Sequence, residues 1–290
     1  MIFEHRTYLP GFGFFLALTG TFFYLFKERY LKIAVIILLM VAAINTVLTY
    51  QRNKIWLNEY TLWSDCLKKS PNKARVHSSL GNTYQKLGQY QRAIEEYNEA
   101  IRITPDYADY YYDRGTAYGK LSQYQQAIED YNKAISLKKD YAEAYNGRGD
   151  AHNYLGHYQQ AIEDFNKAIS LEPDYGLAYY NRGLAYDNLG QYQNAIENYN
   201  EAILLNPNYA DAYNNRGNVY NKFGQYQRAI DDFNKAIHLQ PNNAGAYNNR
   251  GLTYLLQGYN EPGCYDLQKA CEMGGGCKAL EWAKGNGNCH

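Results

Sequence analysis

Two apolar runs dominate the first 50 residues of the chain. Residues 9–26 ("LPGFGFFLALTGTFFYLF") and 33–50 ("IAVIILLMVAAINTVLTY") contain no charged residue, and "KERYLK" lies between them. Because a helix needs roughly 20 apolar residues to cross a bilayer, we expect a membrane anchor over 1–53 with two transmembrane helices, at about 9–26 and 33–50. A second run so soon after the first disfavours a cleaved signal peptide. A buried helical hairpin in a soluble core is the alternative.

The positive charges around these runs predict an orientation. The connecting segment holds Lys27, Arg29 and Lys32, whereas only Arg6 precedes the first run. Because cytoplasmic loops are enriched in Lys and Arg, we expect this segment to face the cytoplasm and both ends of the anchor to face outward. The sequence therefore predicts an integral membrane protein whose remaining chain lies on the extracytoplasmic side, periplasmic or lumenal.

After residue 70 the apolar pattern becomes a repeat. The stretch "AYNNRG" begins at Ala212 and again at Ala246, 34 positions later. Small residues kept in such a register let paired helices approach closely, and units that cannot bury their apolar faces alone stack into a solenoid. The positions in register are Gly81, Gly115, Gly149, Gly183, Gly217 and Gly251; Ala93, Ala127, Ala161, Ala195 and Ala229; and Ala100, Ala134, Ala168, Ala202, Ala236 and Ala270.

These positions resemble the tetratricopeptide repeat (TPR), in its "AYNNRGxxYxxxGQYQxAI" variety. The resemblance implies an all-α fold in which helix pairs form a right-handed superhelix, with the first helix of each pair lining a concave groove. Residues 54–73 place Trp63, Cys66 and Pro71 as a second helix would, so we expect a linking and capping helix there. The resemblance covers 74–277, as six repeats over 74–107, 108–141, 142–175, 176–209, 210–243 and 244–277, followed by a cysteine-containing cap over 278–290.

Asparagines recur on the first helices of the repeats, away from the glycine. An amide offers both a donor and an acceptor, so a row of them suits the backbone of an extended protein or peptide partner. A similar asparagine ladder is known in the TPR portion of the enzyme that attaches N-acetylglucosamine to proteins. Alternatively, these amides are solvated consensus residues of the repeat. The predicted partner-binding residues are Asn146, Asn181, Asn214, Asn215, Asn218, Asn221, Asn248 and Asn249.

Charge patterning predicts structural pairs and argues against two kinds of partner. The formal net charge is zero, without the basic excess of a nucleic-acid-binding protein. The carboxylate clamp of chaperone-binding TPR domains needs lysines where this chain has Tyr112, Asn146, Tyr180 and Asn214, so we do not expect one. We expect ion pairs to tie helices together, between Arg114, Arg148, Arg182, Arg216 and Arg250 and the acidic residues Glu96, Asp130, Asp164 and Asp232.

Four of the five cysteines lie near the C-terminus, and four cysteines allow three pairings. Cys264 and Cys271 are separated by about 10.5 Å of helical rise, which is beyond disulfide reach. A hairpin turning at Gly274–Gly276 brings Cys271 to Cys277 and Cys264 to Cys289, so we predict these two disulfides, provided that this end lies outside the cytoplasm. Zinc binding is the weaker alternative, because no close Cys-x-x-Cys pair is present.

Known catalytic motifs are absent from the sequence. It has no phosphate-binding loop, no His-Glu-x-x-His and no Gly-x-Ser-x-Gly, and its six histidines show no metal-ligand spacing. We therefore predict no catalytic residue, no metal site and no cofactor. However, "EHRTYLPGFGF" (Glu4–Phe14), followed by the two apolar runs and the repeats, resembles the last membrane segments of O-mannosyltransferases of the GT-C class that use dolichyl-phosphate-mannose and carry C-terminal TPRs. In that family the catalytic acids belong to an early outer loop, which we expect to be missing from this chain.

Two functions follow from these observations. The first is a membrane-anchored TPR scaffold that binds protein or peptide partners in its concave groove and performs no catalysis. The second is the acceptor-binding C-terminal part of a GT-C-type glycosyltransferase, similar to enzymes that transfer O-mannose or O-linked N-acetylglucosamine, whose chemistry a separate polypeptide supplies. An assembly factor for a larger complex would differ from the first only in its partner. The sequence leaves the oligomeric state open.

Overall fold

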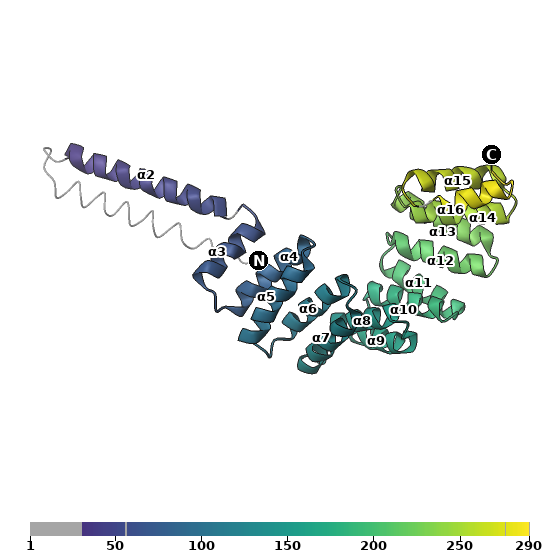
Figure 1. Ribbon diagram of the computed structural model, residues 1–290, viewed down its shortest axis with the longest axis horizontal. Coiled ribbons are helices and arrows are strands. Elements are labelled where there is room, and N and C mark those ends of the chain that lie inside the picture. Colours follow the sequence, from purple (N-terminus) through teal and green to yellow (C-terminus); the bar gives the residue numbers. More distant parts are fainter. Residues whose placement is uncertain (1–30, 56, 276, 290) are drawn as a thin grey trace. The chain divides into compact units, whose positions relative to one another are not determined.

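The chain is helical wherever the structure describes regular elements. The computed structural model describes residues 31–55, 57–275 and 277–289, and no strand occurs among them. Two compact units divide the chain, Met1–Pro71 and Asn72–His290. The helices carry the labels of Figure 1.

The first unit contains two described helices, α2 (Leu31–Ile55) and α3 (Glu59–Lys69). The apolar side chains of α2 are largely exposed, Leu39 to 65%. α3 begins after Asn58, whose side-chain oxygen accepts a hydrogen bond from the N–H of Thr61 at 2.8 Å. This is an N-cap, which satisfies a backbone donor in the first turn of α3.

The expectation of a membrane anchor over 1–53 with two transmembrane helices is corrected. Within the described part of the chain, no helix combines the length and the apolar composition needed to cross a membrane. The longest run of α2 without a polar residue is Ile33–Ile44, because Asn45 and Thr46 interrupt it, and it falls short of the roughly 20 residues that a span needs. The other predicted span, 9–26, lies outside the described residues. The same finding overturns the prediction of an integral membrane protein with extracytoplasmic repeats.

The second unit is a solenoid of stacked helix pairs (Figure 1). Within each pair a first helix packs on a second helix, and each second helix packs on the first helix of the next pair. The last helix, α16 (Lys278–Gly285), packs on α15. The six pairs are α4 (Ala74–Lys86) with α5 (Tyr90–Ile103), α6 (Ala108–Lys120) with α7 (Tyr124–Leu137), α8 (Ala142–Tyr154) with α9 (Tyr158–Leu171), α10 (Gly176–Asn188) with α11 (Tyr192–Leu205), α12 (Ala210–Lys222) with α13 (Tyr226–Leu239), and α14 (Ala244–Leu256) with α15 (Asn260–Glu272).

The small residues lie where the two helices of a pair cross, as the register predicts. A Cβ atom added to Gly217 would stand 2.7 Å from Cε1 of Phe233, and one added to Gly149 would stand 2.7 Å from Cε1 of Phe165. Both rings are completely buried, so they have little room to move aside. The crossing alanines are equally inaccessible to solvent: Ala93, Ala127, Ala161, Ala195 and Ala229.

The turn between the two helices of a pair requires a left-handed residue. Gly156, with φ of 77°, occupies this position in the third repeat. Its N–H donates to the Asn153 carbonyl at 3.0 Å, and the next N–H donates to the His152 carbonyl at 2.9 Å, which closes the C-terminal end of α8. In the second repeat Ser122 adopts the same conformation with φ of 59°, the sole non-glycine residue with positive φ in the described chain.

Candidate functional site

A cavity of about 560 Å³ lies among the first helices of the second, third and fourth repeats, α6, α8 and α10. Its lining is rich in phenol rings, which offer apolar faces and hydroxyl groups to a ligand. The lining includes Gly147, Glu143, Asp150 and Lys120, together with the tyrosines Tyr112, Tyr124, Tyr131, Tyr154, Tyr175 and Tyr180.

Gly147 forms the floor of this cavity on α8. A Cβ atom at this position would stand 2.7 Å from Cζ and 3.0 Å from the hydroxyl oxygen of Tyr131, a second-helix residue. Only a glycine therefore leaves the Tyr131 ring in its place at the base of the groove. The ring lies 5.9 Å from that of Tyr112 on α6, measured between centroids, so the aromatic wall continues along the base of the groove.

The predicted asparagines form bridges between neighbouring first helices. The side-chain N–H of Asn181 donates to Oδ1 of Asn146 at 3.1 Å, and that of Asn249 donates to Oδ1 of Asn214 at 3.1 Å. Asn215 donates to the hydroxyl of Tyr180 at 2.9 Å. Each amide thus reaches a side chain on the first helix of the preceding repeat. These hydrogen bonds assign to five of the eight predicted residues a role in holding the repeats together.

Of the remaining predicted asparagines, Asn221 forms a further bridge, from α12 to α14. The side-chain N–H of Asn221 donates to the Thr253 hydroxyl at 2.6 Å, while its buried carbonyl oxygen has no partner among the described atoms. Asn218 and Asn248 are half-buried on α12 and α14. The asparagines therefore run along the same series of first helices as the cavity, but the cavity itself contains only Asn146 and Asn181.

Sequence reasoning missed the tyrosines and acids of the cavity. Glu143 and Asp150 are both half-buried on α8, two helical turns apart and therefore on one face. Burial raises the pKa of Asp150, while the Lys120 charge acts in the opposite direction. Burial, and after it the Glu143 charge, raises the pKa of the Tyr112 phenol. A signal was present, because Tyr112 and Tyr180 occupy one repeat position, but only the folded chain brings them around Gly147.

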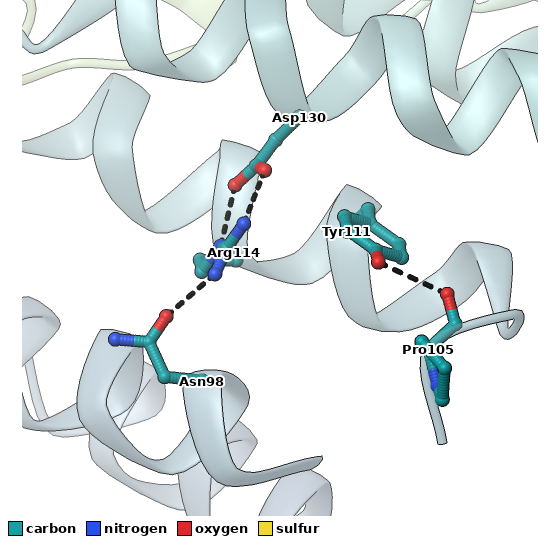
Figure 2. A network of polar contacts seen from close by, with 5 residues as sticks. All are labelled: Asn98, Pro105, Tyr111, Arg114 and Asp130. Carbon is teal, nitrogen blue, oxygen red and sulfur yellow. Dashed lines mark hydrogen bonds and ion pairs between the residues drawn. The ribbon is translucent and has the colours of Figure 1, made fainter. Parts of the chain in front are cut away.

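A recurring arginine network joins three helices in each of five repeats. Figure 2 shows its first occurrence, in which Arg114 binds Asp130 through Nε at 2.7 Å and Nη2 at 2.6 Å, and donates from Nη1 to Asn98 at 2.6 Å. Asp130 lies on the second helix of the same repeat and Asn98 on that of the preceding repeat. In Figure 2, Tyr111 also donates its hydroxyl to the Pro105 carbonyl, at 2.9 Å.

The predicted ion pairs are therefore confirmed at Arg114–Asp130, Arg148–Asp164 and Arg216–Asp232. Arg250 pairs with Asp266 in the same way. Two expectations differ from the structure. Arg182 meets the neutral Asn198, and Glu96 lies 2.7 Å from Nδ1 of His77. The asparagines that complete the network also recur in the sequence and could have been found by their register: Asn98, Asn132, Asn166, Asn200 and Asn234.

The C-terminal cap contains two disulfides. Cys264 is bonded to Cys289 with a Cα–Cα distance of 5.6 Å, and Cys271 is bonded to Cys277 with a distance of 4.7 Å. These are the pairs that the hairpin argument predicts. Cys66 is a free thiol on α3. Among the described residues, no group of three or more His, Cys, Asp or Glu side chains is arranged to hold a metal ion.

Comparison with known proteins places the chain in the tetratricopeptide repeat family. Family models described as tetratricopeptide repeat match residues 108–141, 142–175, 176–209 and 210–243, and also 62–95 and 233–272. A model described as TPR repeat matches 86–122. The chain belongs to this family, and the recognition made from its sequence is confirmed.

Individual relatives share parts of this architecture. The human protein O-mannosyl-transferase TMTC3 is 30% identical over 98 residues, which are 33% of this chain and 11% of that protein. The crystal structure of the APC/C hetero-tetramer Cut9–Hcn1 has a TM-score of 0.69 at 22% identity, over 80% of this chain and 46% of that one, and supports the fold alone. YrrB, described as a TPR protein with an unusual peptide-binding site, has a TM-score of 0.53 at 25% identity, over 66% of this chain and 98% of that one.

Proposed function

We propose that this chain is a protein-interaction scaffold that holds an extended segment of a partner polypeptide in the groove formed by α6, α8 and α10. The observation that carries the proposal is the cavity of about 560 Å³ among these first helices. An extended peptide presents its backbone amides and alternate side chains to such a groove. The peptide-binding site described for YrrB supports the same use of the fold.

The rigid setting of the groove also supports this proposal. The hydrogen bond from Asn181 to Asn146 holds α10 in register with α8, and that from Asn215 to Tyr180 fixes α10 against α12. A preorganised groove loses less conformational freedom when it binds a ligand. On this proposal the chain contributes binding and no chemical step of its own.

Site-directed photocrosslinking tests the proposal. Benzoylphenylalanine replaces Tyr154, which is 65% exposed and lines the cavity, and in a control variant it replaces the exposed Gln159 on the second helix α9. We expect adducts with a discrete partner peptide from the Tyr154 variant, and none of that peptide from the Gln159 variant. Adducts of equal yield at both positions, or none at Tyr154, would contradict binding in the groove.

A second candidate function rests on the likeness to the human O-mannosyl-transferase. On this proposal the same groove holds the acceptor polypeptide while a separate glycosyltransferase modifies it. The expected partner is then a protein mannosylated on serine or threonine, and the chain should co-purify with a multi-span transferase. Adducts that contain only unmodified peptides, in a preparation without any transferase, would exclude this candidate and leave the first intact.

A further inference from the structure

The series of inter-repeat amide bridges is interrupted at the third repeat. In the next three repeats Asn181, Asn215 and Asn249 each donate a hydrogen bond to a side chain on the preceding first helix. Gly147 occupies the same repeat position on α8 and has no side chain with which to reach Tyr112. The Tyr131 ring lies where the first atom of such a side chain would stand, 2.7 Å from a Cβ added to Gly147, and the cavity opens beside Gly147 and this ring.

The two walls beside Gly147 are phenol rings held in place from behind. Tyr112 on α6 packs against Tyr131 and Tyr141, with centroid distances of 5.9 and 5.1 Å. Tyr180 on α10 packs against Tyr209, with a centroid distance of 4.7 Å. These contacts fix the rings on either side of the cavity. Faces of tyrosine rings attract cations, most strongly where water is excluded.

Two carboxylates complete the cavity on α8. Glu143 and Asp150 are seven residues apart, so they stand on the groove face roughly 10.5 Å from each other along the helix axis, with Gly147 between them. Within the described chain, no residue donates a hydrogen bond to the Asp150 carboxylate. Lys120 is the single cation in the lining and is exposed. The site therefore contains more negative than positive charge, beside an electron-rich aromatic wall.

We propose that the cavity between α6, α8 and α10 binds the side chain of a lysine or arginine from an extended partner peptide. The cation lies between the Tyr112 and Tyr180 rings over Gly147, and its charge is balanced by Glu143 and Asp150. The inference rests on the proposed peptide-binding function and specifies the partner as basic at this position. The carboxylates exclude an acidic side chain through repulsion.

The test measures fluorescence anisotropy with the full chain and labelled peptides of about 12 residues. The peptides are identical except for their central residue, which is Arg, Lys, Leu, Gln or Glu. We expect the Arg and Lys peptides to bind at least about tenfold more tightly than the Leu, Gln and Glu peptides, and this difference to shrink as salt is added. A double variant, Glu143→Gln with Asp150→Asn, should remove the preference but retain the weaker binding.

Two further variants separate a charge effect from general damage. Glu201→Gln removes an exposed carboxylate from the second helix α11 and should leave the preference unchanged. Gly147→Asn adds a side chain that must displace the Tyr131 ring from the cavity lining, and it should lower the affinity of all the peptides, provided that circular dichroism shows an intact fold. Peptides that bind without any basic preference, or a preference that survives the double variant, would overturn this inference and leave the proposed function standing. Absence of binding by every peptide would overturn both.

Discussion

Arg182 donates a hydrogen bond from Nε to Oδ1 of Asn198 at 2.7 Å, at a position where the equivalent arginines meet an aspartate. Burial therefore lowers the pKa of the Arg182 guanidinium, with no carboxylate beside it to compensate. In the preceding repeat, the hydrogen bonds that Arg148 donates to the Asp164 carboxylate raise the pKa of the Arg148 guanidinium despite its burial. The fourth repeat thus contains a half-buried cation without a charged partner in its network.

Replacing Asn198 by Asp should stabilise the protein. The new carboxylate would accept hydrogen bonds from both Nε and Nη2 of Arg182, as Asp232 accepts them from Arg216 at 2.8 and 2.6 Å. Bidentate pairs of this kind are stronger than neutral hydrogen bonds. We expect the free energy of unfolding to rise by about 1 kcal/mol, measured by urea denaturation at neutral pH. The gain is limited because Asn198 now donates to the Asn194 carbonyl at 2.8 Å, a bond that Asp would lose.

The matched control is Asp232→Asn, which gives Arg216 a neutral asparagine as its partner, as Arg182 has in Asn198. It should lower the free energy of unfolding by about 1–3 kcal/mol, because it leaves a buried guanidinium without its carboxylate. A stabilising effect of Asp232→Asn, or a destabilising effect of Asn198→Asp, would show that the carboxylate is not what makes this network favourable.

Ser122→Gly should also stabilise the chain. Ser122 holds φ of 59° where the equivalent residues of other repeats are glycines, and a left-handed conformation costs a residue with a Cβ roughly 1–2 kcal/mol. We expect a gain of about 1 kcal/mol in the free energy of unfolding, reduced slightly because glycine makes the unfolded chain more flexible. The converse variant, Gly156→Ser, should lower the free energy of unfolding by a similar amount. If thermal unfolding showed that both variants change the midpoint temperature in the same direction, the argument would be refuted.

The glycines of the first helices should divide into two classes when they are replaced by alanine. At Gly217 the added Cβ would stand 2.7 Å from the buried Phe233 ring, so overpacking should lower the free energy of unfolding by roughly 1–3 kcal/mol. At Gly119 no atom outside the adjoining backbone of its own helix lies within 4 Å of the added Cβ. Gly119→Ala should therefore stabilise its helix by about 0.5–1 kcal/mol. Equal effects at the two positions, in chemical denaturation, would mean that the helix crossing tolerates a larger residue.

The repeat architecture was predictable because it depends on local regularity. Each helix crossing needs a small residue at one fixed position, so the register of glycines such as Gly217 also fixes the register of the helix pairs. The arginine pairs follow from the same periodicity. The membrane prediction was wrong because it relied on the absence of charged residues over 33–50. That is a weaker condition than an uninterrupted apolar run, and Asn45 and Thr46 interrupt the apolar run of α2.

The cavity was not predictable in the same way, because it depends on a departure from the repeat. The asparagines stand out in the sequence as a recurring residue type, and the structure places six of them in bridges between repeats. The cavity opens where the class is broken, at Gly147. From the sequence alone, a single glycine among asparagines does not indicate a cavity. Its importance follows only from the structure, which places the rings of Tyr112 and Tyr131 beside it.

The two disulfides predict how the C-terminal cap responds to reduction. Peptide mapping without reductant, on protein prepared under oxidising conditions, should recover Cys264 linked to Cys289 and Cys271 linked to Cys277, with Cys66 as the alkylated thiol. The Cys264–Cys289 bond closes a loop with a sequence separation of 25 residues, so Cys264→Ser with Cys289→Ser should destabilise the cap by roughly 2–4 kcal/mol. Limited proteolysis should then cleave near α16 first. Recovery of four free thiols, or of other pairings, would contradict the structure of the cap.

Asp113 should make stability depend on pH. Burial, and after it the charge of Asp109 one turn earlier on α6, raises the pKa of this carboxyl from 3.8 to about 7, although a hydrogen bond with Asn82 on α4 acts against the shift. Between these two pH values the folded chain retains a proton that the unfolded chain has lost. The free energy of unfolding should therefore fall as the pH rises from about 4 to 7.

Asp113→Asn removes this titration and should stabilise the chain mainly above pH 7. We expect a gain of about 1 kcal/mol at pH 8 and little change at about pH 4, a figure kept small because Asp113 is only partly shielded from water. Urea denaturation of both proteins at several pH values measures it, and Asp140→Asn, at an exposed carboxylate in a turn, is the control. A gain of the same size at every pH would assign the effect to packing. A loss at pH 8 would mean that the ionised Asp113 is favourable in the folded groove, and the sign of the argument would be wrong.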